Sequence, residues 1–66
     1  MSIRIVPDLP IHEYRGEGRR AEVYKLSKSN FIVRTYKNSV WQEDKELMQG
    51  ERFAENFAEN FVLGEL

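Results

Sequence analysis

Few residues in this chain have the chemistry that an active site or a metal centre needs. The chain has no cysteine, and His12, which precedes Glu13, is its one histidine. The lack of cysteine excludes a thiol nucleophile, a disulfide and thiolate metal sites, and a single histidine cannot anchor a zinc centre. We therefore expect no metal and no cofactor.

The other reactive side chains are better explained by structure than by catalysis. Three serines fall in segments with turn composition: Ser27, Ser29 and Ser39. A set of carboxylates is also close in sequence, but neighbouring strand residues point to opposite faces: Glu43, Asp44 and Glu46. A chain of 66 residues also lacks the length to enclose a deep cleft. The sequence thus predicts a protein that is not an enzyme.

Charge is divided unevenly along the chain, although the formal net charge is only −1. Residues 1–36 carry seven basic and four acidic side chains, a net of +3. Residues 37–66 carry three basic and seven acidic ones, a net of −4. Either opposite charges meet across the fold, or one pole meets a charged partner.

The length fits one small domain, residues 1–66, and the 12% aromatic content favours folding. A core of this size supplies only about 3–5 kcal/mol of net stability, so binding to a partner or to itself would help. No apolar run reaches the roughly 20 residues of a membrane span, and no signal-peptide core follows Met1. We expect a soluble cytoplasmic protein without a membrane partner.

Two neighbouring segments predict a β-hairpin. Residues 21–26 and 31–36 are rich in β-branched and aromatic residues, and they enclose Ser-Lys-Ser-Asn, a four-residue turn. Leu26 pairs with Phe31 in this register.

A second turn at Asn38 and Ser39 leads into a third strand over residues 40–45. Two favourable cross-strand pairs then fall on one face: Tyr36 with Trp41, and Arg34 with Glu43. A short helix over residues 40–48 is the alternative, because residues 39–42 fit a capping box. That helix would place Asp44 within its apolar stripe, so the strand is favoured.

The C-terminal segment predicts an amphipathic helix over residues 50–63. It contains the sequence Ala-Glu-Asn-Phe twice in tandem, and a period of four keeps like residues close to one face. We expect an apolar row to pack on the sheet: Phe53, Phe57 and Phe61. We expect an acidic row to point to solvent: Glu51, Glu55 and Glu59. Gly64 stands where a left-handed C-cap is expected.

These elements predict an α+β domain, a three-stranded antiparallel β-meander with one C-terminal α-helix packed on one face. The meander covers residues 21–47 and the helix residues 50–63. Residues 1–20 form an extended or strand-containing N-terminal segment, with a short strand at residues 3–6 and a flexible loop at residues 15–20.

The single helix leaves the second face of the sheet to other uses. The more uniformly apolar set is expected to meet the helix: Tyr24, Leu26, Phe31 and Val33. The opposite set has mixed character: Ala21, Val23, Ile32, Arg34, Tyr36 and Trp41. Its Tyr, Trp and Arg are residue types enriched at binding hot spots. Two alternatives remain, in which residues 3–14 fold over this face or the helix itself packs there.

A nucleic-acid interface is an alternative use of the same open face. The three strands, the following helix and the exposed Arg and aromatic residues, over residues 20–62, resemble the arm-binding domain of tyrosine integrases, which lays its sheet in the major groove. Four basic residues could supply a local patch: Arg19, Arg20, Lys28 and Arg34. The net acidic charge counts against this reading, because phosphate contacts need an excess of Lys and Arg.

The C-terminal stretch FAENFAENFVLG, residues 53–64, resembles the end of short accessory proteins from T4-like phages of marine cyanobacteria. In those proteins an Ala-Glu-Asn-Trp-Val-Leu-Gly-like ending follows a hydrophobic hairpin, and Phe61 stands where they carry Trp. The resemblance implies a virus-encoded protein of the bacterial host cytoplasm that binds host components. It transfers no site residues.

The sequence as a whole predicts a small non-catalytic protein-binding module that modulates a host or viral protein. Its candidate partner-binding residues lie on the open sheet face and on the acidic helix row: Arg34, Tyr36, Trp41, Glu51, Glu55 and Glu59. A homo-oligomer and a nucleic-acid-binding module are the alternatives.

Overall fold

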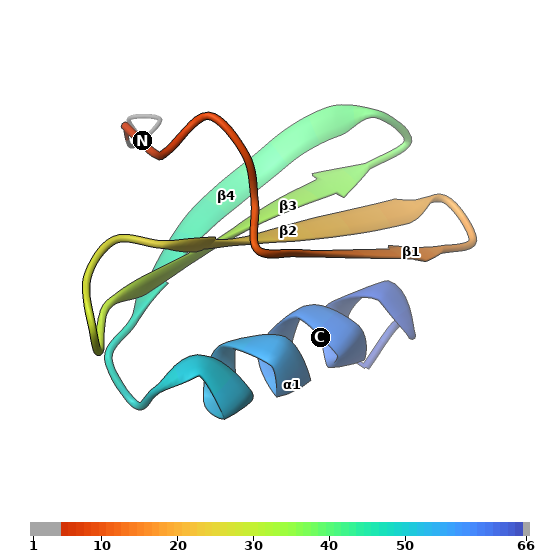
Figure 1. Cartoon of the computed structure of the whole chain (residues 1–66). Coiled ribbons are helices and arrows are strands. Elements are labelled where there is room, and N and C mark those ends of the chain that lie inside the picture. The colour runs from red at the N-terminus through yellow and green to blue at the C-terminus, as the bar shows by residue number, and fades with distance from the viewer. Residues whose placement is uncertain (1–4, 66) are drawn as a thin grey trace.

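The structure, a computed structural model that describes residues 5–65, contains four strands followed by one helix (Figure 1). The elements in chain order are β1 (His12–Gly16), β2 (Arg19–Lys25), β3 (Phe31–Lys37), β4 (Val40–Leu47) and α1 (Glu51–Val62). Consecutive strands pair antiparallel, so the sheet order is β1-β2-β3-β4 and α1 crosses one face. The predicted α+β fold with an antiparallel sheet and one C-terminal helix is confirmed.

The expected strand number was wrong, because β1 adds a fourth strand to the meander. The segment expected to be a flexible loop instead ends β1 and begins β2. Glu17 and Gly18 make a two-residue turn between them, and Gly18 adopts a positive φ of 71° that favours glycine. Of the short strand expected at residues 3–6, residues 3 and 4 lie outside the described residues, and Ile5 and Val6 are not in a strand.

The hairpin of β2 and β3 has a register one residue away from the expected one. Lys25, not Leu26, pairs with Phe31, and the connecting loop spans five residues instead of four. Because successive strand residues face opposite sides, this single step exchanges the two faces of β2. Val23 therefore points toward α1 and Tyr24 points away, the reverse of the expectation, while Leu26 lies in the loop.

The hairpin of β3 and β4 has the expected two-residue turn, and the alternative helix over residues 40–48 is wrong. Asn38 and Ser39 both have positive φ, 52° and 68°, as a type I′ turn requires. Tyr36 pairs with Trp41 as expected. A β-bulge then inserts one extra residue in β4, so that Asp44 and not Glu43 lies opposite Arg34.

The core lies between α1 and the inner face of the sheet. Its buried members are Ala21, Val23, Phe31, Val33, Leu47, Ala54, Ala58, Phe61 and Val62. The two alanines of α1 are completely buried, which lets the helix backbone approach the sheet closely. The expectation that the phenylalanine row would pack against the sheet holds for Phe61, holds in part for Phe57 and fails for Phe53.

The phenylalanine row twists out of the core toward the start of α1. Phe61 is 7% exposed, Phe57 is half-buried at the core margin, and Phe53 is 47% exposed. Four residues turn a helix by about 40° more than one full turn, so a row with a period of four drifts around the helix. The expected burial of all three rings was therefore wrong.

The C-terminal end of α1 is fixed by its own cap and by the β1–β2 turn. Gly64 has a φ of 85° and donates to Phe61 O, while Glu65 N donates to Asn60 O, which confirms the expected left-handed cap in a Schellman arrangement. Arg19 Nη1 also donates to Phe61 O at 2.9 Å. A Cβ on Gly16 would clash with Val62 O, so this close approach requires glycine.

The two edges of the sheet are β1 and β4. α1 packs against β1, β2 and β3, while the side of β4 that carries Glu43 and Lys45 continues the helix-facing surface of the sheet. The N-terminal segment runs away from the start of β1 on the side of the sheet opposite α1 (Figure 1). This face, called the open face below because α1 does not cover it, still buries Ile32 and Tyr24, which are 0% and 6% exposed.

Candidate functional site

Arg34, the first candidate partner-binding residue, is held by an ion pair on the open face. Its Nε and Nη2 donate to Asp44 Oδ1 and Oδ2, both at 2.9 Å, and Trp41 Nε1 donates to Asp44 Oδ1 at the same distance. The side chains of Arg34 and Asp44 are 14% and 1% exposed. The hydrogen bonds to Asp44 raise the pKa of Arg34, against the opposing effect of its burial. Arg34 is partly exposed, as expected, and Asp44 holds its guanidinium in place, while its role in partner binding stays a prediction.

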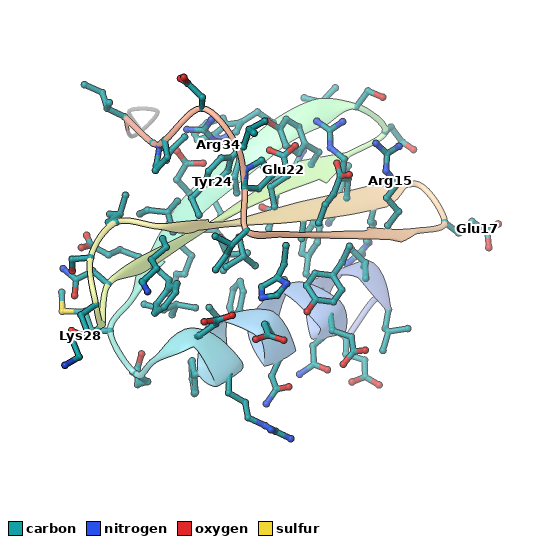
Figure 2. All side chains as sticks on the ribbon, in the orientation of Figure 1. Arg15, Glu17, Glu22, Tyr24, Lys28 and Arg34 are labelled. Atoms are coloured by element: carbon teal, nitrogen blue, oxygen red, sulfur yellow. The ribbon has the colours of Figure 1, made fainter. Side chains whose placement is uncertain are left out.

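Tyr36 and Tyr24 line the same face beside arginines. The guanidinium of Arg20 lies 4.0 Å from the ring centroid of Tyr36, and that of Arg34 lies 5.6 Å from the ring of Tyr24. Tyr24 OH donates to Glu22 at 2.8 Å, and the two side chains project together on this face with Arg34 (Figure 2). Burial, followed by the hydrogen bond to Glu22, raises the pKa of Tyr24 to about 12.

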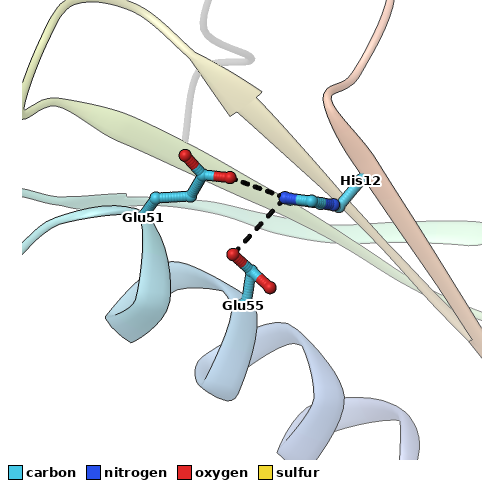
Figure 3. Close-up of side chains that lie close together, drawn as sticks. All are labelled: His12, Glu51 and Glu55. Carbon is cyan, nitrogen blue, oxygen red and sulfur yellow. Dashed lines mark hydrogen bonds and ion pairs between the residues drawn. The ribbon is translucent and has the colours of Figure 1, made fainter.

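Two members of the acidic row lie against β1 instead of pointing to solvent. His12 Nε2 is 2.8 Å from Glu51 Oε2 and 3.4 Å from Glu55 Oε2 (Figure 3). Tyr14 OH donates to Glu55 Oε1 at 3.4 Å, and burial, then the charge of Glu55, raises the pKa of Tyr14. In the sequence His12 stands beside Glu13, and no local pattern indicates its contact with Glu51 of α1, which lies 39 residues further along the chain.

The cluster of His12, Glu51 and Glu55 is also the place where a divalent cation could be held. One ligand atom from each side chain lies within 4.8 Å of the others. Imidazole and carboxylate ligands suit zinc and similar ions. The contacts present in the structure are those of an ion pair between β1 and α1, with all three side chains about one-third to one-half exposed. Pairs this exposed contribute little to stability, about 1 kcal/mol or less.

The six candidate residues do not form one continuous surface. Arg34, Tyr36 and Trp41 lie together on the face of the sheet that points away from α1. The three glutamates lie on α1, on the other side of the sheet, and of these Glu59 is exposed without a contact to His12. A single partner cannot cover both sets through one flat interface, so the two surfaces are separate candidates.

The structure reveals a further candidate surface on α1 that the sequence did not single out. Four residues line a pocket of about 280 Å³, and we call them the outer seam: Phe53, Asn56, Phe57 and Asn60. Their spacing is i, i+3, i+4 and i+7, which is the spacing of a stripe along one side of a helix. The signal in the sequence was the drift of the four-residue period, which turns Phe53 outward while Phe61 stays in the core.

Compared with protein-family models, with curated proteins and with solved structures, the chain matches none of them. Within residues 5–65, no helix has both the length and the apolar character that crossing a membrane requires.

Proposed function

We propose that this chain is a small non-catalytic module that binds a protein partner through the outer seam of α1. The observation that carries the proposal is the 47% exposure of Phe53 beside a half-buried Phe57 in a pocket of about 280 Å³. A domain of this size needs most of its large apolar side chains in its core to be stable. Aromatic rings left in a surface hollow are typical of binding surfaces.

The spacing and charge of the seam indicate what kind of partner fits. A stripe at i, i+3, i+4 and i+7 suits a second amphipathic helix, whose apolar side chains would enter between the rings. Asn56 and Asn60 offer amide groups that fix the register of such a helix. Three glutamates and one arginine make α1 acidic over residues 51–59, so the partner helix should carry Lys or Arg beside its apolar stripe.

Non-catalytic action is part of the proposal, and the contacts of the one histidine support it. His12 contacts the carboxylates of Glu51 and Glu55, and these contacts join β1 to α1, a structural role. The phage-like C-terminal stretch is the reason to look for the partner in a bacterial host.

Capture with point variants tests the proposal. The immobilised chain and its Phe53→Ser and Phe57→Ser variants are incubated with host lysate, with Val40→Ser as the matched control. Val40 is also an exposed apolar residue, at 61%, but it lies at the β3–β4 turn. We expect a protein that is lost from both seam variants, is retained by the control and binds again when purified. Equal capture by all variants would contradict the proposal, and loss only in a Tyr36→Ser variant would assign the sheet face instead.

Light scattering at two protein concentrations tests whether the chain forms a homo-oligomer. A concentration-dependent rise in mass that Phe53→Ser abolishes would identify a second copy as the partner helix. A constant monomer mass would leave the seam to another protein.

The alternative of a nucleic-acid-binding sheet face has less support than the sequence suggested. Of the four basic residues named for it, Arg34 is paired with Asp44, and Lys28 lies in the β2–β3 loop at the opposite end of the sheet from the β1–β2 turn (Figure 2). Only Arg19 and Arg20 are adjacent.

A further inference from the structure

The β1–β2 turn and the β3–β4 turn lie side by side and enclose a small pocket. Asn38 N donates to Gly18 O at 2.8 Å, which joins the two turns directly. The pocket has a volume of about 210 Å³ and is lined by both turns and by arginines, among them Arg15 and Arg20. We call it the turn pocket.

Basic residues at this end of the sheet are direct cross-strand partners. Arg15 and Arg20 are direct cross-strand partners on the open face, and Arg19 is the direct partner of Lys37 on the other face. Like charges at opposed positions of an antiparallel pair lower stability. Two such pairs at one end of a small sheet create a positive pole that an anion would neutralise.

Each arginine of the turn pocket has at least one contact with the rest of the domain. Arg19 Nη1 donates to Phe61 O, at the C-terminal end of α1. Arg20 stacks on Tyr36, and its Nε lies 3.8 Å from Glu22 Oε2. Arg15, whose side chain is 69% exposed, contacts Glu13 at 3.3 Å.

Carboxylates are excluded from the lining of the turn pocket. Its residues are arginine, glycine, tyrosine, asparagine and serine. Glu17 belongs to the β1–β2 turn but projects outward from its tip (Figure 2). Glu13 and Glu22 contact single arginines at 3.3 and 3.8 Å, distances longer than those of a strong charge-assisted hydrogen bond.

Size and donor type identify the ligand class. A volume of about 210 Å³ is below the roughly 300–1,000 Å³ of pockets that enclose a whole small molecule, so the pocket suits one anionic group. Guanidinium groups present forked N–H donors that match the oxygens of phosphate, and the side chains of Asn38 and Ser39 add neutral donors. We propose that the turn pocket binds a phosphate group, carried either by a small phosphate ester or by the backbone of single-stranded nucleic acid.

A titration with inorganic phosphate, followed by amide chemical shifts in two-dimensional NMR, tests the site. Sodium chloride at equal ionic strength is the reference. We expect shifts concentrated at Gly18, Arg19, Asn38 and Ser39, and a higher melting temperature in phosphate than in chloride. Equal shifts in chloride, or shifts centred on the β2–β3 loop around Lys28, would overturn the proposal.

Two variants that each remove one positive charge show whether phosphate binding depends on the turn pocket or only on the net charge of the chain. Arg15→Gln removes an exposed pocket arginine and should weaken phosphate affinity roughly tenfold. The fold should survive, because the substitution also removes the repulsion with Arg20. Lys28→Gln removes one exposed charge at the opposite end of the sheet and should leave the affinity unchanged. Equal affinities for Arg15→Gln and the wild-type chain would overturn the proposal.

A third comparison shows whether the bound phosphate group belongs to a small phosphate ester or to a nucleic-acid backbone. A mononucleotide and a single-stranded oligonucleotide are titrated at the same phosphate concentration, with an uncharged nucleoside as control. Equal affinity for the first two supports a small phosphate ester. Tighter binding of the oligonucleotide, with shifts that extend to the Tyr36 and Trp41 side chains, supports a nucleic-acid backbone. Binding of the nucleoside alone would overturn recognition through phosphate.

Discussion

Arg34 of β3 and Asp44 of β4 form a bidentate ion pair, and Asp44 also accepts the indole N–H of Trp41. One carboxylate that is only 1% exposed thus satisfies three donors from two strands. The β-bulge makes this possible, because without the extra residue Glu43 would stand opposite Arg34. The pair fixes the positions of the Arg34 and Trp41 side chains on this face of the sheet.

Asp44→Asn should destabilise the domain strongly. The substitution keeps the shape of the side chain but removes the negative charge that Asp44 presents to the guanidinium of Arg34, and breaking a buried ion pair in this way costs about 3–5 kcal/mol. Urea unfolding followed by circular dichroism measures the loss. Glu17→Gln, at the tip of the β1–β2 turn, is the control and should stay within about 0.5 kcal/mol of the wild-type value. A normal unfolding midpoint for Asp44→Asn would show that the ion pair is dispensable.

Alanine substitutions along the phenylalanine row should have graded effects. Phe61→Ala removes a buried core ring and should cost about 3–5 kcal/mol, whereas Phe53→Ala should cost about 1 kcal/mol or less. Phe57→Ala should fall between them, since that ring is half-buried at the core margin. Thermal melting of the three variants gives the order. Equal losses at all three positions would mean that the whole row packs on the sheet.

Ser39→Gly should stabilise the domain. Ser39 has a φ of 68°, a conformation that costs a residue with a Cβ more than glycine, and relief should raise the free energy of unfolding by about 0.5–1 kcal/mol. Ser29→Gly is the matched control, because the positive-φ residues other than glycine are Asn38 and Ser39 within the part of the chain described. Glycine at position 29 should leave the melting temperature unchanged or lower it. A gain at position 29 equal to that at 39 would contradict the turn geometry.

High pH should destabilise the domain through Tyr24. Its pKa is raised to about 12 in the folded chain from the ordinary tyrosine value of 10.0, so folding favours the protonated phenol. The unfolded chain binds fewer protons between these values, and the free energy of unfolding should therefore fall as the pH rises from about 10 to 12. Ultraviolet absorbance of tyrosinate follows the titration. Tyr24→Phe should remove the step near pH 12, while Tyr14→Phe should retain it.

The parts of the fold that local sequence determines were predictable. The β3–β4 hairpin follows from Asn-Ser between two strand-forming segments and from the facing pair of Tyr36 and Trp41. The helix follows from its repeat, and its end follows from Gly64. Each signal lies within a few residues of the element that it predicts.

The parts that depend on distant contacts were not predictable from local patterns. β1 contains a glycine that resembles a loop residue, but Gly16 is required because Val62 O lies against it. The one-residue shift between β2 and β3 depends on a five-residue loop that composition does not distinguish from a four-residue one. His12 meets Glu51 only because β1 runs alongside α1, and the turn pocket exists only because two turns far apart in the sequence are neighbours.

The edge strand β4 has a consequence for how the chain behaves at high concentration. An exposed strand edge can recruit a strand from another molecule and begin a growing sheet. On the helix side of β4, Glu43 and Lys45 lie beyond the buried Leu47, and a second layer stacked on them would have to desolvate both charges. These two charges therefore disfavour the stacking of a second sheet on this side of β4, as amyloid-like assembly would require.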